Sequence, residues 1–210
     1  MSNIINALQS RYATKKFNPN KTVSQDKINI LQEAFRLTAT SFGLQPLKLI
    51  VIQNKTLQEK LISASFNQRQ VADASHLLII AIEKDYKNTL IEEHFDLEMQ
   101  IRGTKPEILA PFKNYLTENF ANKSPKELRQ FALNQAYITL GNLMTVCAIE
   151  AIDACPMEGF SPEKYNELLD LSSKNLEAVL LLPVGYRADD DENSSRKKVR
   201  KPLDKLILEL

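Results

Sequence analysis

The longest patterned segment of the chain is SPKELRQFALNQAYITLGNLMTVCAIEAID, residues 124–153. It opens with Ser124, Pro125 and Glu127, which form a capping box with proline at the first helical position. The apolar run that follows is interrupted by four polar side chains: Thr139, Asn142, Thr145 and Glu150. A membrane span carries few such groups, so the segment predicts a long buried helix. The rest of the fold has to pack around that central helix.

Three apolar runs of the β type accompany this helix: LKLIVIQ at 47–53, SHLLIIAIE at 75–83 and EAVLLLPVGYR at 177–187. Helical patterns occupy other segments: 2–10, 23–37, 55–65 and 86–121, the last with a break between Gly103 and Pro106. Strands dispersed among helices predict an α/β or α+β fold. No repeat or low-complexity linker divides the 210 residues, of which 43% are hydrophobic. A single domain over residues 1–210 is therefore predicted.

The end of the chain, LDKLILEL at 203–210, is apolar and strand-like, yet the sequence offers it no obvious partner within the chain. One solution is a tail that leaves its own subunit and pairs with another. This feature predicts a dimer.

Several common kinds of site are excluded at the level of motifs. The chain has five glycines and contains neither a GxGxxG nor a GxxxxGK[ST] pattern. His76 and His94 cannot form a metal cage alone, and Cys147 and Cys155 make no CxxC pair, so no metal site is predicted. The start lacks a basic segment followed by an apolar core, which favours a reducing cytoplasm. A net charge of +1 predicts neither a nucleic-acid nor a membrane partner.

Two basic clusters stand out in this neutral chain: RYATKKF at 11–17 and RKKVRKP at 196–202. Read alone, each is more typical of a solvated surface than of a site. Together they are consistent with two halves of a site for a small anion. Read alone, CPMEGF at 155–160 is an ordinary helix stop in which Gly159 supplies a positive φ, and His76 is a partly buried histidine with its hydrogen bonds satisfied.

Taken in order, however, these segments resemble the nitroreductase family of FMN-dependent NAD(P)H oxidoreductases, essentially from end to end. The resemblance is to the branch of oxygen-insensitive nitroreductases and dihydropteridine reductases. It rests on an ordered set of motifs: RYATKKF, TSFGLQP before a strand, ADASHLLII, NQAYITLGNLMTVCAIEAIDACPMEGF, LLLPVGYR and KVRKP. The motif R-x-[ST]-x-[KR]-x-F is weak by itself, but PxEGF followed by a strand ending in PVGYR is specific.

The resemblance implies an α+β sandwich with a central, mainly antiparallel sheet flanked by helices. It also implies an intertwined homodimer in which the C-terminal tails are exchanged and FMN lies at the subunit interface. NADH or NADPH would be the reductant. A small electrophile such as a nitroaromatic or a quinone would be reduced by ping-pong hydride transfer through flavin N5. The alternatives are dihydropteridine reduction, ene reduction or dehalogenation on the same scaffold, a non-catalytic flavin-binding protein, and a cofactor-free domain with solvated basic clusters.

On the phosphate side of the flavin, the resemblance implies a clamp of Arg11, Lys198 and Arg200. Lys15 would contact the ribityl–ring region, whereas Lys16 would lie in solvent. Guanidinium and ammonium groups suit a dianionic phosphate. Two further flavin contacts are implied beside Arg11: Tyr12 and Ala13. Relatives often carry His and Ser at these two places.

On the ring side, the resemblance implies three sets of contacts. The loop against the ring comes from the neighbouring subunit and comprises Thr40, Ser41 and Gly43. The pyrimidine edge is contacted by Asn67 and Gln70. The segment over the other face comprises Pro156, Glu158 and Gly159, with a backbone N–H approaching N5. Phe42 is predicted to face the substrate, and no side chain is predicted to be catalytic.

Gln70 and Leu47 depart from the family pattern, in which Lys and Trp are common at these places. Gln70 can donate a hydrogen bond but brings no charge to the pyrimidine edge. A lower flavin reduction potential than in a Lys-bearing relative is predicted, unless Arg69 or Lys15 supplies the missing charge. Leu47 is expected to alter packing only.

Overall fold

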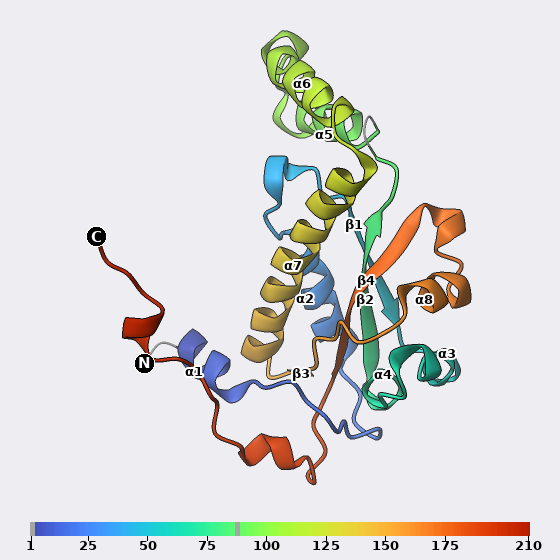
Figure 1. Ribbon diagram of the computed structural model, residues 1–210, viewed down its shortest axis with the longest axis vertical. Coiled ribbons are helices and arrows are strands. Elements are labelled where there is room, and N and C mark those ends of the chain that lie inside the picture. The colour runs from blue at the N-terminus through green and yellow to red at the C-terminus, as the bar shows by residue number, and fades with distance from the viewer. Residues whose placement is uncertain (1–2, 87–88) are drawn as a thin grey trace.

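The computed structural model describes residues 3–86 and 89–210 of the chain, and its centre is an antiparallel sheet (Figure 1). The strands are β1 (Leu47–Ile52), β2 (His76–Glu83), β3 (Asp153–Ala154) and β4 (Leu176–Gly185). Their order is β1-β2-β4-β3, and every neighbouring pair is antiparallel. The three predicted strands are confirmed. The two-residue β3 was missed because it is too short to show a pattern.

Strand β2 is apolar along almost its whole length because both faces of the sheet are covered. Leu78 and Ile80 belong to one buried cluster, while Leu77 and Ile79 belong to a second one. Successive side chains of a strand point to opposite faces, so the two clusters lie on the two sides of the sheet. The absence of alternation in the sequence of β2 follows from this double burial.

The predicted central helix is α7 (Pro125–Ile149), and it lies across one face of the sheet (Figure 1). Its capping box is formed as predicted, with Ser124 and Glu127 bonded reciprocally. Its buried side includes Ala132, Leu140 and Leu143, which join the first cluster. Two more helices contact it: α1 (Asn3–Ser10) and α2 (Gln25–Arg36).

The opposite face of the sheet is covered by three short helices: α3 (Lys55–Lys60), α4 (Gln70–Asp73) and α8 (Pro162–Leu168). At the upper end of Figure 1, α5 (Thr89–Arg102) and α6 (Pro106–Ala121) project beyond the sheet as a helical hairpin. The predicted break between them is confirmed, with Gly103 at a φ of +66°. Within the described residues, no helix is long and apolar enough to cross a membrane.

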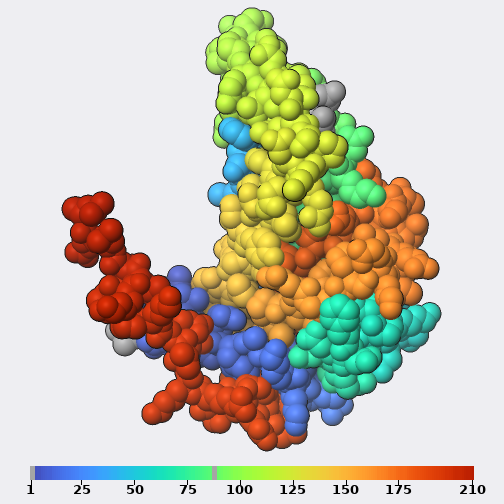
Figure 2. All heavy atoms as spheres, in the orientation of Figure 1, coloured from blue at the N-terminus to red at the C-terminus, as the bar shows by residue number. Residues whose placement is uncertain are grey.

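The C-terminal tail leaves the body of the molecule after the 3-10 turn Glu192–Ser195 and ends far from it (Figure 2). Residues 196–202 have no regular structure, and Leu203–Lys205 form a single 3-10 turn. The strand-like pattern of the tail therefore gives no strand in the single chain, because no other strand lies beside it to pair with its backbone. The apolar side chains of the tail are exposed, Val199 at 86% and Leu208 at 80%.

Candidate functional site

The RYATKKF stretch runs along the end of the sheet and is fixed to it on two sides. Ala13 forms a parallel bridge with Ala154, and Phe17 forms an antiparallel bridge with Arg187. The backbone N–H of Asn18 donates to the carbonyl of Tyr186 at 2.8 Å. These contacts hold the stretch extended, with its backbone beside β3 and the end of β4.

A buried carboxylate, Asp191, organises this stretch from behind. One of its oxygens accepts hydrogen bonds from the backbone N–H groups of Lys15, at 2.9 Å, and Lys16, at 3.2 Å, and from the hydroxyl of Tyr12 at 3.0 Å. Burial acts to raise the pKa of Asp191, but the hydrogen bonds outweigh it, so the pKa is lowered. Sequence reasoning missed this residue, because three adjacent aspartates, residues 189–191, look alike in a polar loop.

Tyr12 is held by its own chain. Its hydroxyl is bonded to Asp191, and the guanidinium of Arg187 lies over its ring at 4.6 Å. Burial and the bond to Asp191 raise the pKa of Tyr12 to about 12, so the phenol is neutral. Arg187 is in turn held by Asp153, through its Nε at 2.8 Å.

The two basic clusters meet in space at Arg11 and Lys198, which are 187 positions apart in the sequence. The Nζ of Lys198 donates to the backbone carbonyl of Arg11. Partial burial and the nearby Arg11 and Arg200 guanidinium groups lower the pKa of Lys198, so three cations share one region. Within the described residues, no carboxylate forms an ion pair with any of these three or with Lys15. Lys16, by contrast, pairs with Asp190 at 2.8 Å and lies outside the cluster, where it was expected.

This positive charge without an acidic partner can be compared with the charge of an FMN phosphate. Like charges repel, so three neighbouring cations without an acidic partner are unfavourable unless an anion joins them. A phosphate dianion accepts several charge-assisted hydrogen bonds from such donors. The cluster of Arg11, Lys198 and Arg200 therefore fits the phosphate.

The segments around Asn67 and Gly159 lie side by side. Gln68 donates from its Nε2 to the carbonyl of Gly159 at 2.8 Å. A Cβ at position 159 would lie 3.1 Å from that same nitrogen, and the φ of Gly159 is not positive. The reading of Gly159 as a positive-φ position is wrong. Asn67 has a φ of 60°, and Gln70 is buried at 9% exposure.

Cys155 lies between Ala154, which forms the bridge to Ala13, and the segment 156–159. Burial raises the pKa of its thiol, while the charges of Lys15 and Arg11 act nearby in the opposite direction. The following residues are Pro156, half-buried, and Glu158, exposed. Pairwise contacts thus link the predicted segments: Lys198 contacts Arg11, Ala13 bridges Ala154, and Gln68 contacts Gly159.

The loop Ser41–Gly43 lies elsewhere, beside the first half of α7 and far from RYATKKF (Figure 1). The backbone N–H of Ser41 donates to Gln135 Oε1 at 2.9 Å. Gly43 has a φ of +72°, and a Cβ there would lie 2.8 Å from His94 Cε1. The hydroxyl of Thr40 is buried and has no partner within the described residues. A single chain does not bring this loop to the cation cluster.

Phe42 is 43% exposed and borders a pocket of about 470 Å³. The residues that line this pocket are Phe42, Gly43, His94, Leu97, Glu98, Ile101, Arg102 and Phe112. The ring of Phe42 packs against Phe112 and Phe131, each at a centroid distance of 6.3 Å. The helical hairpin of α5 and α6 therefore forms one wall beside the predicted substrate residue.

Fold and site together define an α+β sandwich protein with a cationic site for a small anion. A model of the nitroreductase family matches residues 8–186. A Staphylococcus haemolyticus protein provisionally named an NAD(P)H nitroreductase is 34% identical over 97% of this chain and 95% of its own length. A Bacillus subtilis protein provisionally named in the same way is 32% identical over 93% and 94%. The chain belongs to the nitroreductase family, and the predicted class, an FMN-dependent NAD(P)H oxidoreductase, is confirmed at the level of the family.

Solved structures confirm the predicted fold. A provisionally assigned NAD(P)H:FMN oxidoreductase from Staphylococcus epidermidis superposes with a TM-score of 0.87, covering 100% of this chain and 97% of that one, at 21% identity. A provisionally assigned nitroreductase from Exiguobacterium sibiricum, crystallised in complex with FMN, gives a TM-score of 0.84 at 20% identity, with 100% and 98% covered.

Proposed function

We propose that this chain, as a single domain over residues 1–210, is an FMN-dependent NAD(P)H oxidoreductase that reduces small electrophiles such as nitroaromatics or quinones. The observation that carries the proposal is the meeting of Arg11, Lys198 and Arg200 without an acidic partner in the described chain. A solvated surface gives no reason for two distant segments to gather cations at one point. A phosphate-bearing cofactor does.

The residues of the cluster have separate parts in this proposal. Arg11, Lys198 and Arg200 hold the phosphate, and Lys15 reaches the ribityl–ring region. Ala13 lies in the same stretch and offers its backbone. Asp191 keeps the stretch extended and leaves the Lys15 ammonium without a carboxylate partner, because it binds backbone N–H groups instead. Tyr12 supports the stretch through Asp191, so only its backbone is left for the cofactor.

In this proposal, neutral groups of the protein hold the flavin ring. Asn67 and Gln70 offer hydrogen bonds to the pyrimidine edge, and the backbone around Pro156, Glu158 and Gly159 covers one face. Arg69 is engaged by Asp73 at 2.7 Å and by Glu59 at 3.3 Å, so its charge is compensated. Lys15 is then the cation left to compensate for Gln70. FMN, when bound, supplies the hydride transfer between NAD(P)H and the acceptor, in ping-pong order.

A homodimer completes the site in this proposal. The loop with Thr40, Ser41 and Gly43 serves the partner's site, where Phe42 faces the substrate. The exposed apolar tail needs a surface, and the outer edge of β1 offers one with unpaired backbone groups. A groove of about 350 Å³ runs beside this edge. The residues that line it are Gln32, Phe35, Leu47, Lys48, Leu49 and Val51. A cytoplasmic location is part of the proposal, in keeping with two free, buried cysteines.

The absorption spectrum of the purified protein, with FMN added if needed, tests the proposal. A yellow protein that NADH or NADPH bleaches, and that a nitroaromatic or quinone reoxidises, is the expected result. Bleaching without reoxidation by any acceptor would indicate a flavin-binding protein that is not a reductase. A colourless protein that takes up no FMN would overturn the proposal, and a panel of pteridine, enone and halogenated substrates separates the related chemistries.

A further inference from the structure

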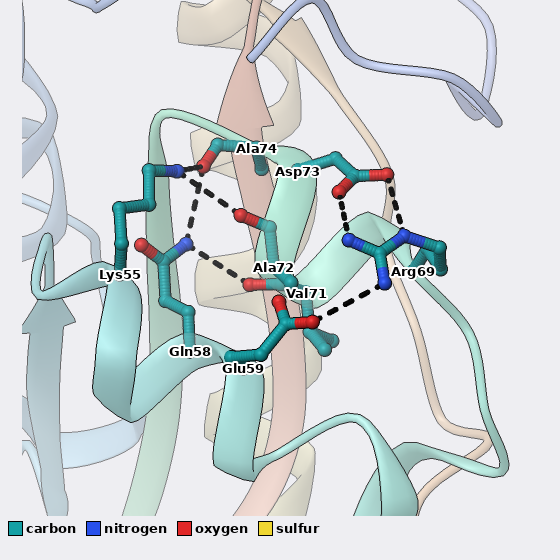
Figure 3. A network of polar contacts seen from close by, with 8 residues as sticks. All are labelled: Lys55, Gln58, Glu59, Arg69, Val71, Ala72, Asp73 and Ala74. Atoms are coloured by element: carbon teal, nitrogen blue, oxygen red, sulfur yellow. Dashed lines mark hydrogen bonds and ion pairs between the residues drawn. The ribbon is translucent and has the colours of Figure 1, made fainter.

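Helices α3 and α4 are joined by a dense set of polar contacts (Figure 3). Helix α4 has only four residues, so its carbonyl groups cannot all be satisfied within it. They are also shielded from water, since Val71 and Ala74 are 0% exposed and Ala72 is 5% exposed. A buried carbonyl without a donor is costly, so this turn depends on donors from outside.

Two side chains of α3 supply those donors. Gln58, which is 0% exposed, donates from Nε2 to the carbonyls of Val71 at 2.9 Å and Ala74 at 3.1 Å. Lys55 donates from Nζ to the carbonyls of Ala72 at 3.0 Å and Ala74. Figure 3 shows both side chains reaching toward the same turn. Lys55 is an exposed residue, but its ammonium group ends on the carbonyl groups of α4.

A second set of contacts fixes the other side of the same turn. Arg69 is bonded to Asp73 at 2.7 Å and to Glu59 of α3 at 3.3 Å. The turn is therefore held between two layers of polar contacts, and its first residue is Gln70. Gln70 is 9% exposed and begins the turn that these contacts hold.

We propose that Lys55 is a positioning residue for flavin binding: by capping the carbonyls of Ala72 and Ala74, it fixes the orientation in which Gln70 meets the pyrimidine edge. This inference rests on the proposed function. Lys55 does not touch the flavin, and it acts through the backbone of α4. Its effect on the cofactor therefore depends on the presence of the Gln70 side chain.

A double-mutant cycle tests this dependence, with the dissociation constant of FMN measured by fluorescence titration of apoprotein. Lys55→Met keeps the stem and removes the donors. Lys60→Met, on the same helix and exposed, removes the same charge without touching α4 and is the matched control. The cycle combines Lys55→Met with Gln70→Ala. Circular dichroism verifies folding, and Lys55→Ala, which also removes the donors, takes the place of Lys55→Met if the latter does not fold.

Lys55→Met is expected to weaken FMN binding about threefold to tenfold, which corresponds to loss of the single proposed hydrogen bond from Gln70 to the flavin. The same loss is expected to lower the flavin potential. In the Gln70→Ala background, the same change is expected to have no further effect on the dissociation constant, and Lys60→Met is expected to bind like the wild type. Equal losses in both backgrounds, or no loss in either, would overturn the role of Lys55 while leaving flavin binding intact. A wild-type protein that binds no FMN would refute the proposed function instead.

Discussion

At the scale of the residue, the two basic clusters form one site only if they act on the same anion. Arg11→Ala combined with Lys198→Ala removes two cations from the cluster that has no acidic partner. Each charge-assisted contact contributes about 1.5–3 kcal/mol, so FMN binding is expected to weaken at least about a hundredfold. The measurement is the flavin content of the purified protein and its dissociation constant.

Lys16→Ala with Lys197→Ala is the control for that experiment. It removes the same charge from the same two segments, but Lys16 is paired with Asp190 rather than directed to the cluster. This variant is expected to keep its flavin. If both double variants lose flavin equally, the effect is one of net charge, and the clamp is wrong.

Asp191 ties the stability of the site to pH. Its folded-state pKa is lowered, so its contribution is present above the unfolded value of about 3.9 and is lost as the pH falls through the folded value. Asp191→Asn is expected to reduce the free energy of unfolding at pH 7 by about 1–3 kcal/mol, because charge-assisted acceptors are lost. Urea unfolding at pH 7 and at pH 4 measures this, and the exposed Asp189→Asn is expected to match the wild type. An Asp191→Asn variant as stable as wild type would contradict this role.

In the proposed site, Gln70 brings no charge to the pyrimidine edge of the flavin. Since Arg69 is compensated by two carboxylates, a lysine at position 70 adds a cation that nothing on α4 duplicates. Gln70→Lys is expected to raise the midpoint potential by about 30 mV, which corresponds to ~1.4 kcal/mol for a two-electron couple. Spectroelectrochemistry measures the potential, with the neutral Gln70→Met as the control. An unchanged potential would refute the idea that Gln70 lowers the potential of the flavin.

At the scale of the element, two glycines have opposite requirements. Gly185 ends β4, and a Cβ there would lie 2.9 Å from Phe17 Cδ1 and 3.0 Å from the backbone nitrogen of Ser75. Gly185→Ala is expected to destabilise the protein by about 1–3 kcal/mol, because it separates RYATKKF from the sheet. Gly141 lies inside α7 with nothing within 4 Å of its Cβ position, so Gly141→Ala is expected to stabilise by about 0.5–1 kcal/mol. Thermal unfolding compares the two, and a stabilised Gly185→Ala would show that RYATKKF is not held at this point.

The sequence predicts an element well when the contacts that form it lie between neighbours in the sequence. Helix α7 could be predicted, because Ser124 and Glu127 cap it through neighbours in sequence. Strand β3 could not, because its two residues become a strand only by pairing with β4. Asp191 and the Lys55 contacts were missed for the same reason, since their partners lie in distant segments. The residues of the cation cluster were predicted from the family resemblance. The contact between Lys198 and Arg11 could be seen only in the structure.

At the scale of the whole molecule, the tail decides whether one chain is a complete unit. Its exposed apolar side chains beyond Arg200 are Leu203, Leu206, Ile207, Leu208 and Leu210, each at least 57% exposed. Leaving such groups in water forgoes the stabilisation that burial would provide. Truncation after Arg200 removes all of them and keeps Lys198 and Arg200, so it separates the role of the tail from that of the cations.

The truncated chain is expected to be monomeric in light scattering, whereas the full chain is expected to be a dimer. FMN binding is expected to weaken as well, because the loop with Ser41 no longer reaches a partner's site, although every cation of the cluster is present. Replacing Lys205 and Glu209 by alanine keeps the apolar side chains and is expected to preserve both the dimer and the flavin. A truncated chain that remains a dimer with full flavin content would mean that the tail does not assemble the molecule.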